Sequence, residues 1–168
     1  MKEVSFKNDI LPLKDMLFRL AFRITLNRED AEDIVQETLI RLWKETKEQE
    51  IQNVKAFALT VCKNLSLDHN ELKEKQNISF VEDVHEQIDA AHQPDETIED
   101  NEKFGFLNNV INELPEKQRM AIQLRDVEGR TYKEIAEIMN ISESDVKVNI
   151  FRARQKVKDR LIKKNIYN

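Results

Sequence analysis

The chain has 168 residues, of which 40% are hydrophobic and 35% are charged, and it carries a formal net charge of −5 with only two Gly and three Pro. This length allows at most two small domains, and so few turn-forming residues predict an all-α fold with short connections. A β-sandwich, a Gly-rich nucleotide-binding fold and a low-complexity chain are disfavoured. No apolar run reaches the ~20 residues of a membrane span, no secretory signal is visible, and the single Cys62 has no disulfide partner, so we expect a soluble cytoplasmic protein.

Charge is distributed unevenly along the chain. Residues 1–75 have a net charge of −1, residues 76–101 contain eight acids and no Lys or Arg, and residues 102–168 have a net charge of +4. The acidic middle also contains Pro94 and few large apolar residues, as a linker does. The sequence therefore predicts two helical domains, 1–75 and 102–168, joined by an acidic linker over 76–101. A short helix at about 80–91 within that linker stays open.

The first block predicts three or four helices. The earliest has an apolar face formed by Leu13, Met16, Leu17, Leu20, Ala21 and Ile24. Asn27 with Asp30 forms the pattern of an N-cap that starts a helix at Arg28 and continues to Lys44. Its predicted buried arc consists of Ala31, Ile34, Val35, Thr38, Leu39 and Leu42.

Ile40 lies on the opposite, polar face of that helix, among Asp33, Gln36 and Glu37. An apolar residue ringed by polar and acidic side chains suggests a protein-binding patch, although single exposed apolar residues are also common on ordinary surfaces.

A third helix is predicted over 54–63, followed by a break or cap at Asn64–Asp68 and a further helix over 69–75. Asn, Ser and Asp favour caps over helix interiors, which is the reason for placing a break there. Phe57 and Cys62 are expected in the core and His69 on the surface. One Cys and three scattered His provide no set of metal ligands, so no metal site and no cofactor are predicted.

The last block has the spacing of a helix-turn-helix. A helix opens at Pro115, with Met120, Ile122 and Leu124 inside and Gly129 after its end. Thr131 and Glu134 form a capping box that begins the next helix. The expected turn has Asn140 in the left-handed conformation, and Ser142 with Asp145 caps the final helix, whose buried face is Val146, Ile150, Ala153 and Val157.

On that final helix, Lys147, Val148, Phe151 and Arg152 are predicted to point outward. Residues 147–168 contain eight basic side chains and one acid, a net charge of +7. Apolar contact with thymine methyls or sugars, beside Arg or Lys that reach guanine, would explain an exposed Phe on a basic helix. Packing on another protein, or a solvated basic tail, remains the alternative.

Three stretches together resemble a known family: Asp30-Ala-Glu-Asp-Ile-Val-Gln-Glu37, the Asn64-x-x-x-Asp68 segment, and the region from Leu114-Pro-Glu to Phe151-Arg-Ala-Arg154. The sequence resembles the extracytoplasmic-function sigma factors of bacterial RNA polymerase. The resemblance implies a subunit that binds core RNA polymerase, directs it to promoters and helps open the DNA. It also implies an anti-sigma partner.

The resemblance also implies roles for particular residues. The surface of Asp33, Gln36, Glu37 and Ile40 would bind the core polymerase. A loop formed by Asn64, Leu65, Ser66, Leu67 and Asp68 would capture a flipped base of the minus-ten element, with Lys55, Lys63 and Lys73 near single-strand phosphates. Lys147, Val148, Phe151 and Arg152 would read the minus-thirty-five element, and Ser144, Arg154, Lys156 and Arg119 would hold its phosphates.

Two other classes of function are the alternatives. A stand-alone helix-turn-helix regulator, with an amino-terminal dimerisation or sensing domain, is the main alternative, and it would bind specific DNA tightly without polymerase. An enzyme is disfavoured because the sequence has no nucleophile–base pair, phosphate loop or metal-ligand spacing.

Overall fold

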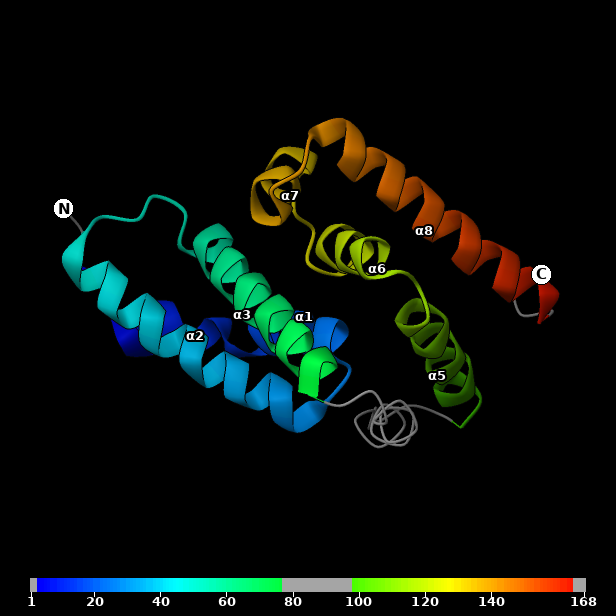
Figure 1. Ribbon diagram of the computed structural model, residues 1–168, viewed down its shortest axis with the longest axis horizontal. Coiled ribbons are helices and arrows are strands. Elements are labelled where there is room, and N and C mark those ends of the chain that lie inside the picture. The colour runs from blue at the N-terminus through cyan, green and yellow to red at the C-terminus, as the bar shows by residue number, and fades with distance from the viewer. Residues whose placement is uncertain (1–2, 77–97, 165–168) are drawn as a thin grey trace. The chain divides into compact units, whose positions relative to one another are not determined.

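The computed structural model describes residues 3–76 and 98–164, and these form two compact helical units (Figure 1). The first unit holds the helices up to Gln76 and the second holds those from Ile98 onward. The described residues contain no β-strand, which confirms the predicted all-α fold. The first unit consists of η1 (Phe6–Ile10, a π turn), η2 (Leu11–Leu13, a 3₁₀ turn), α1 (Lys14–Thr25), α2 (Arg28–Glu48) and α3 (Val54–Gln76). The second consists of α5 (Ile98–Asn112), α6 (Glu116–Ile122), η3 (Gln123–Val127, a π turn), α7 (Tyr132–Met139) and α8 (Glu143–Lys163).

In the first unit, α1 packs against both α2 and α3, and α2 packs against α3. The predicted apolar arcs form this core: Leu17, Leu20 and Ala21 of α1 are fully buried, as are Ala31 and Leu42 of α2. A tight corner joins the first two helices. Leu26 takes the left-handed conformation (φ 57°) that ends α1, and Asn27 Oδ1 accepts a hydrogen bond from the Asp30 N–H at 2.9 Å, as the predicted N-cap requires.

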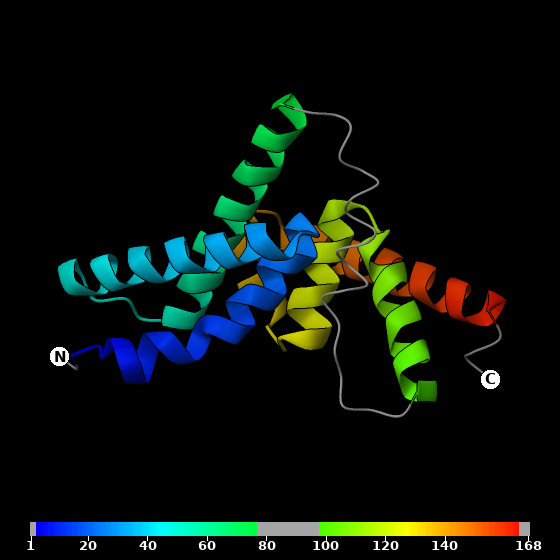
Figure 2. The same ribbon diagram turned by 90° about the horizontal axis from the view of Figure 1, so that it is seen from below.

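The predicted break at Asn64–Asp68 is wrong, because α3 runs without interruption from Val54 to Gln76 (Figure 1, Figure 2). The physical reason is a buried stripe that crosses the expected break: Leu59, Cys62 and Ser66 are each 0% exposed. Tertiary burial of one helical face outweighs the weak preference of Ser, Asn and Asp for caps. Asn64 and Asp68 point outward, where a polar side chain costs a helix little.

The predicted linker can be compared with the structure only at its ends. Gln76 is the last residue of α3, and Ile98 begins α5, so residues 98–101 are helical rather than linker. The possible helix at 80–91 lies outside the described residues.

The second unit packs α8 against α6 and α5 around Val110, Leu114, Ile122, Ala153 and Val157. The helix predicted from Pro115 continues beyond Ile122 as the wider turn η3, after which Gly129 has a positive φ of 69°. Both predicted caps of the helix-turn-helix form. The Thr131 N–H donates to Glu134 Oε1 at 3.2 Å while the Glu134 N–H donates to Thr131 Oγ1 at 3.0 Å, and Ser142 Oγ accepts from the Asp145 N–H at 3.0 Å.

The turn between α7 and α8 has the conformation that the sequence predicts. Asn140 has a φ of 57°, and the Ile141 N–H donates to the Ala136 carbonyl at 3.1 Å. Together these contacts end α7 in a Schellman-type cap and redirect the chain into α8. The predicted inner face of α8 is confirmed, with Val146, Ile150, Ala153 and Val157 all buried.

We predict that Leu59→Ala lowers the free energy of unfolding of the first unit by about 2–5 kcal/mol, because it leaves a cavity where a fully buried side chain was. Leu72→Ala on the same helix is the matched control, since Leu72 is 56% exposed. Urea unfolding followed by circular dichroism measures both. Equal losses in the two variants would contradict the burial of the α3 stripe.

Candidate nucleic-acid and polymerase interfaces

The outward face of α8 brings together the four residues predicted to read a base sequence. Phe151 is 69% exposed and Val148 is 42% exposed, and Lys147 and Arg152 are exposed beside them. The opposite face of α8 is buried in the unit, so these four side chains are held outward by packing. A rigid helix with an apolar centre and flanking cations can enter a major groove, contact thymine methyls and donate to guanine.

Tyr132, at the start of α7, gathers cations next to this face. The Arg125 guanidinium lies 4.5 Å from the centre of the Tyr132 ring and the Lys147 ammonium lies 5.7 Å from it. Arg125 Nη1 also donates to the Arg130 carbonyl at 2.9 Å. The sequence reasoning did not assign a role to Tyr132. An aromatic residue in the first turn of a helix-turn-helix is the signal that could have indicated one.

The expected phosphate contacts on α8 divide into two kinds. Ser144 and Lys156 are exposed. Arg154 instead forms a two-pronged pair with Asp126, with Nε donating to Oδ2 at 3.1 Å, and these hydrogen bonds raise the pKa of its guanidinium. The pair is half-exposed, so a phosphate would have to compete with Asp126 for Arg154.

Arg119, predicted to hold a phosphate, lies inside the fold and not on its surface. Its side chain is buried inside the second unit, and Nη1 donates to the carbonyl of Leu114 at 3.0 Å and to that of Asn112 at 3.4 Å. Burial lowers the pKa of the guanidinium, and nearby Glu116 acts in the opposite direction. Arg119 therefore caps the carboxyl end of α5 from within the fold.

The predicted polymerase-binding residues lie together on α2. Asp33, Gln36 and Glu37 are exposed, and Ile40 is 50% exposed among them. Glu37 Oε1 accepts from Arg41 Nε at 3.1 Å, an exposed pair one helical turn apart. These residues form an acidic surface around one accessible apolar side chain. A surface of this kind is suited to a partner with basic and apolar side chains.

The expected minus-ten residues do not form a loop, and they divide between two faces of α3. Asn64, Asp68 and Lys55 are exposed, and Leu65 and Leu67 are half-buried. Ser66 is fully buried and Lys63 is 7% exposed, so neither side chain lies on the exposed face of α3 where a DNA contact was expected. Burial lowers the pKa of Lys63, and the nearby Asp68 carboxylate opposes that shift.

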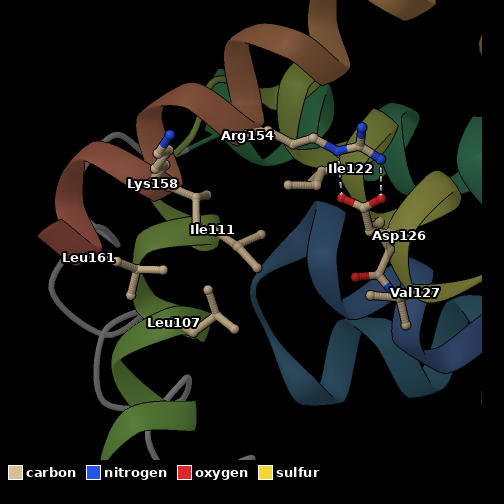
Figure 3. Close-up of a pocket in the computed structure, with 10 residues that line it drawn as sticks. Leu107, Ile111, Ile122, Asp126, Val127, Arg154, Lys158 and Leu161 are labelled. Atoms are coloured by element: carbon tan, nitrogen blue, oxygen red, sulfur yellow. Dashed lines mark hydrogen bonds and ion pairs between the residues drawn. The ribbon is translucent and has the colours of Figure 1, made fainter. Parts of the chain in front are cut away.

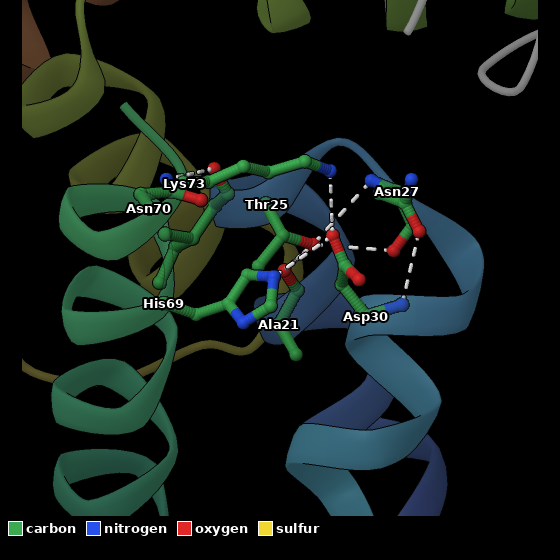
Figure 4. Close-up of polar contacts among 8 residues, drawn as sticks. Ala21, Thr25, Asn27, Asp30, His69, Asn70 and Lys73 are labelled. Atoms are coloured by element: carbon green, nitrogen blue, oxygen red, sulfur yellow. Dashed lines mark hydrogen bonds and ion pairs between the residues drawn. The ribbon is translucent and has the colours of Figure 1, made fainter. Parts of the chain in front are cut away.

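Lys73 was also expected near single-strand phosphates, but its ammonium lies 2.9 Å from Asp30 Oδ2. His69, predicted as a plain surface residue, has its Nε2 2.9 Å from the same oxygen and is about one third exposed. The Asp30 carboxylate, which sequence reasoning used only for a helix start, therefore joins α2 to the far end of α3 (Figure 4).

An apolar groove in the second unit was missed by sequence reasoning. Leu107, Ile111, Ile122, Val157 and Leu161 converge on a hollow of about 490 Å³ between α5, α6 and α8, with the Asp126–Arg154 pair and Lys158 beside it (Figure 3). These positions belong to three helices, so only their tertiary packing shows that they form one surface.

Neither a reactive cysteine nor a metal site is indicated among the described residues. Cys62 is buried, its thiol lies 3.4 Å from the Leu17 carbonyl oxygen, and desolvation raises its pKa to about 12. No three His, Cys, Asp or Glu side chains in the described ranges are grouped to hold a metal ion. Within those same ranges, no helix has the length and apolar character needed to cross a membrane.

Two family profiles match this chain. Residues 10–75 match Sigma-70 region 2, and residues 107–157 match Sigma-70 region 4. The chain is 31% identical to the extracytoplasmic-function (ECF) RNA polymerase sigma factor SigM of Bacillus subtilis over 144 residues, which is 84% of this chain and 86% of SigM. The chain belongs to the ECF RNA polymerase sigma factors.

Two further proteins resemble this chain, one in sequence and one in fold. This sigma factor is 29% identical to SigE of Mycolicibacterium smegmatis over 89% of its own length, and it spans 58% of the length of SigE. Its fold resembles that of RpoE from Bartonella quintana, solved in complex with the anti-sigma factor NepR, with a TM-score of 0.71, 22% identity, and coverage of 93% of this chain and 96% of RpoE. The predicted family is confirmed, and with it the general function of directing RNA polymerase to promoters.

We predict that Arg119→Met lowers the free energy of unfolding of the second unit by about 1–3 kcal/mol, because two carbonyl groups lose a buried donor. The exposed neighbour gives the control, Lys117→Met, which is expected to change it by less than about 0.5 kcal/mol. Thermal unfolding measures both.

The same Arg119 variant tests whether this residue contacts a phosphate. With the protein folded, the salt dependence of promoter DNA binding by the holoenzyme should be the same for Arg119→Met and the wild type. If the plot of the logarithm of the DNA-binding constant against the logarithm of salt concentration is less steep for Arg119→Met by about one released counterion, Arg119 does contact a phosphate.

Proposed function

We propose that this sigma factor reads the minus-thirty-five element with α8, engages the minus-ten strand with the exposed face of α3, and binds core polymerase through α2. It makes no bond change itself, and it acts in the cytoplasm, where core polymerase and promoter DNA meet. The observation that carries the proposal is the outward face of α8, where Phe151 is 69% exposed between Lys147 and Arg152. Exposure of an aromatic ring to water does not stabilise a surface helix, whereas contact with the methyl group of a thymine would remove the Phe151 ring from water.

The polymerase contact is assigned to α2 on charge and exposure. Asp33 and Glu37 supply negative charge, and Ile40 supplies an apolar contact that is already accessible. A mixed surface of this kind favours a partner with basic side chains around an apolar spot. The stand-alone regulator has no use for such a surface unless α2 mediates dimerisation.

We also propose that an anti-sigma protein occludes the α2 and α8 surfaces. The structure of the similar RpoE contains the anti-sigma factor NepR, which supports looking for such a partner here. This proposal needs a protein that competes with core polymerase for the free sigma factor.

The decisive experiment is co-elution of the purified protein with sigma-free Bacillus subtilis core polymerase on a sizing column. A stable one-to-one complex that initiates from promoters selected out of a random DNA pool is the expected result. If the folded protein does not bind core polymerase but binds specific DNA tightly alone, the stand-alone regulator is the correct function.

We predict that Asp33→Lys combined with Ile40→Glu lowers core affinity at least 100-fold, because it reverses a charge and buries a new one at the docking surface. The control makes the same two changes elsewhere on the first unit, Asp15→Lys with Leu11→Glu, where Leu11 is 42% exposed. Fluorescence anisotropy with labelled core gives both affinities, and circular dichroism checks folding. Normal core affinity in the folded α2 variant would exclude this surface.

We predict that Arg152→Ala weakens binding of the selected minus-thirty-five element by about 1–3 kcal/mol and relaxes selectivity at one base pair, as loss of a guanine contact does. The control Lys163→Ala removes one charge from the last turn of α8, about three turns further along the helix from Arg152. Competition binding with single-base variants of the element measures the base selectivity of both protein variants. An equal loss for Arg152→Ala on every DNA sequence would make it a phosphate contact.

A further inference from the structure

The last turns of α3 are held differently from the rest of the helix. Up to Ser66 the buried side chains of α3 are small or apolar, including Leu59 and Cys62, with Lys63 as the one exception. After Ser66 no described side chain of α3 is buried. The residues that continue the same stripe, at intervals of three or four, are His69, Asn70 and Lys73.

Each of these three side chains reaches the corner between α1 and α2 (Figure 4). Lys73 Nζ donates to Asp30 Oδ2 at 2.9 Å, and His69 Nε2 lies 2.9 Å from that oxygen. Asn70 Nδ2 donates to the Ile24 carbonyl at 2.9 Å, just before α1 ends. Polar contacts between residues far apart in the sequence, two of them hydrogen bonds across 43 and 46 residues, thus replace apolar packing at this end of α3.

Asp30 is itself rigidly placed. It lies in the first turn of α2, where its N–H donates to Asn27 Oδ1, and its side chain is only 20% exposed. In addition, Thr25 Oγ1 donates to the Ala21 carbonyl at 2.9 Å and to the Asn27 carbonyl at 3.2 Å, so the corner is tied to α1. Because these contacts hold Asp30 in place, its carboxylate can fix the orientation of the last turns of α3, which bind it.

The face of α3 opposite this attachment carries the exposed Asn64, Asp68 and Lys75. At about 100° per residue these three lie within roughly 40° of one another and on the other side of the helix from Ser66 and Lys73. Rotation or fraying of the last turns would therefore displace the surface that is proposed to meet the minus-ten strand.

We propose that Asp30 is a positioning residue for promoter opening: its carboxylate binds Lys73 and thereby fixes the outward face of α3 against the single strand. This inference rests on the proposed function and deepens it. The proposed role of Lys73 differs from the predicted one, because its ammonium group binds the Asp30 carboxylate and not a DNA phosphate.

The two roles of Lys73 predict opposite results for Asp30→Asn, which removes the charge and keeps the shape of the side chain. If Lys73 is held by Asp30 to position α3, losing the carboxylate impairs opening. If Lys73 is a phosphate contact, losing a nearby negative charge leaves DNA binding unchanged or strengthens it.

The test uses holoenzyme assembled from wild-type or variant protein and Bacillus subtilis core polymerase, on a promoter selected by the wild-type holoenzyme. Permanganate reactivity of unpaired thymines measures opening, and separate assays measure core affinity and closed-complex binding. We expect Asp30→Asn and Lys73→Met each to reduce opening about 10-fold, with core affinity and closed-complex binding within about twofold of wild type.

A double-mutant cycle and two controls complete the design. The Asp30→Asn, Lys73→Met double variant should also lose about 10-fold rather than 100-fold, because both changes break one contact. Lys73→Arg should retain opening, since it keeps a donor cation for Asp30. Lys75→Met removes one charge from the opposite face of the same turn, and its double variant with Asp30→Asn should show the two losses multiplied.

Three outcomes would overturn the proposal: normal or improved opening by Asp30→Asn, a 100-fold loss in the Asp30–Lys73 double variant, or a matching loss of core affinity in both single variants, which would mean that the cluster only supports the fold of the unit. A wild-type holoenzyme that fails to assemble or to open any selected promoter would instead contradict the proposed function.

Discussion

The long helices α2, α3 and α8 of this sigma factor each bury one stripe of side chains, and the faces left exposed are those proposed to bind DNA or polymerase. On α8 the buried stripe is Val146, Ile150, Ala153 and Val157, which leaves Phe151 and Arg152 no position except outward. On α2 the same constraint exposes Ile40. Because a helix repeats every 3.6 residues, the choice of buried residues also fixes the functional face. The core therefore determines the orientation of each proposed interface as well as its stability.

The basic charge of the second unit is less available to DNA than a count of residues suggests. Residues 147–168 carry a net charge of +7. Within the described part of that stretch, Arg154 is paired with Asp126, and Arg160 Nη1 lies 2.7 Å from Glu113 Oε2. Lys147, Arg152 and Lys156 remain exposed close to the reading face. Acids contributed by other elements thus pair with two of the arginines of α8, Arg154 and Arg160, and reduce the positive charge available to DNA.

Local patterns predicted most of the fold, and contacts between distant segments account for what was missed. The N-cap at Asn27, the capping box at Thr131 and the left-handed Asn140 all depend on residues within four positions of one another, and all three are present. The break expected in α3 depended on propensity alone and was overruled by burial of Ser66. Nothing local to Arg119 indicates that it turns inward to two carbonyl groups. Likewise, Asp30 and Lys73 are 43 residues apart, so no periodicity could pair them.

The division into small contact surfaces also bears on how recognition is achieved. The reading face of α8 and the exposed face of α3 each present only a few side chains, and a net charge of −5 opposes close approach of the free chain to DNA. Contacts that are weak singly become strong when one scaffold holds them at the right spacing, because the second contact then forms at high effective concentration. Core polymerase bound to α2 supplies such a scaffold in the proposed function. In the proposed function, selectivity for a promoter is then a property of the holoenzyme, because both contacts are made at once.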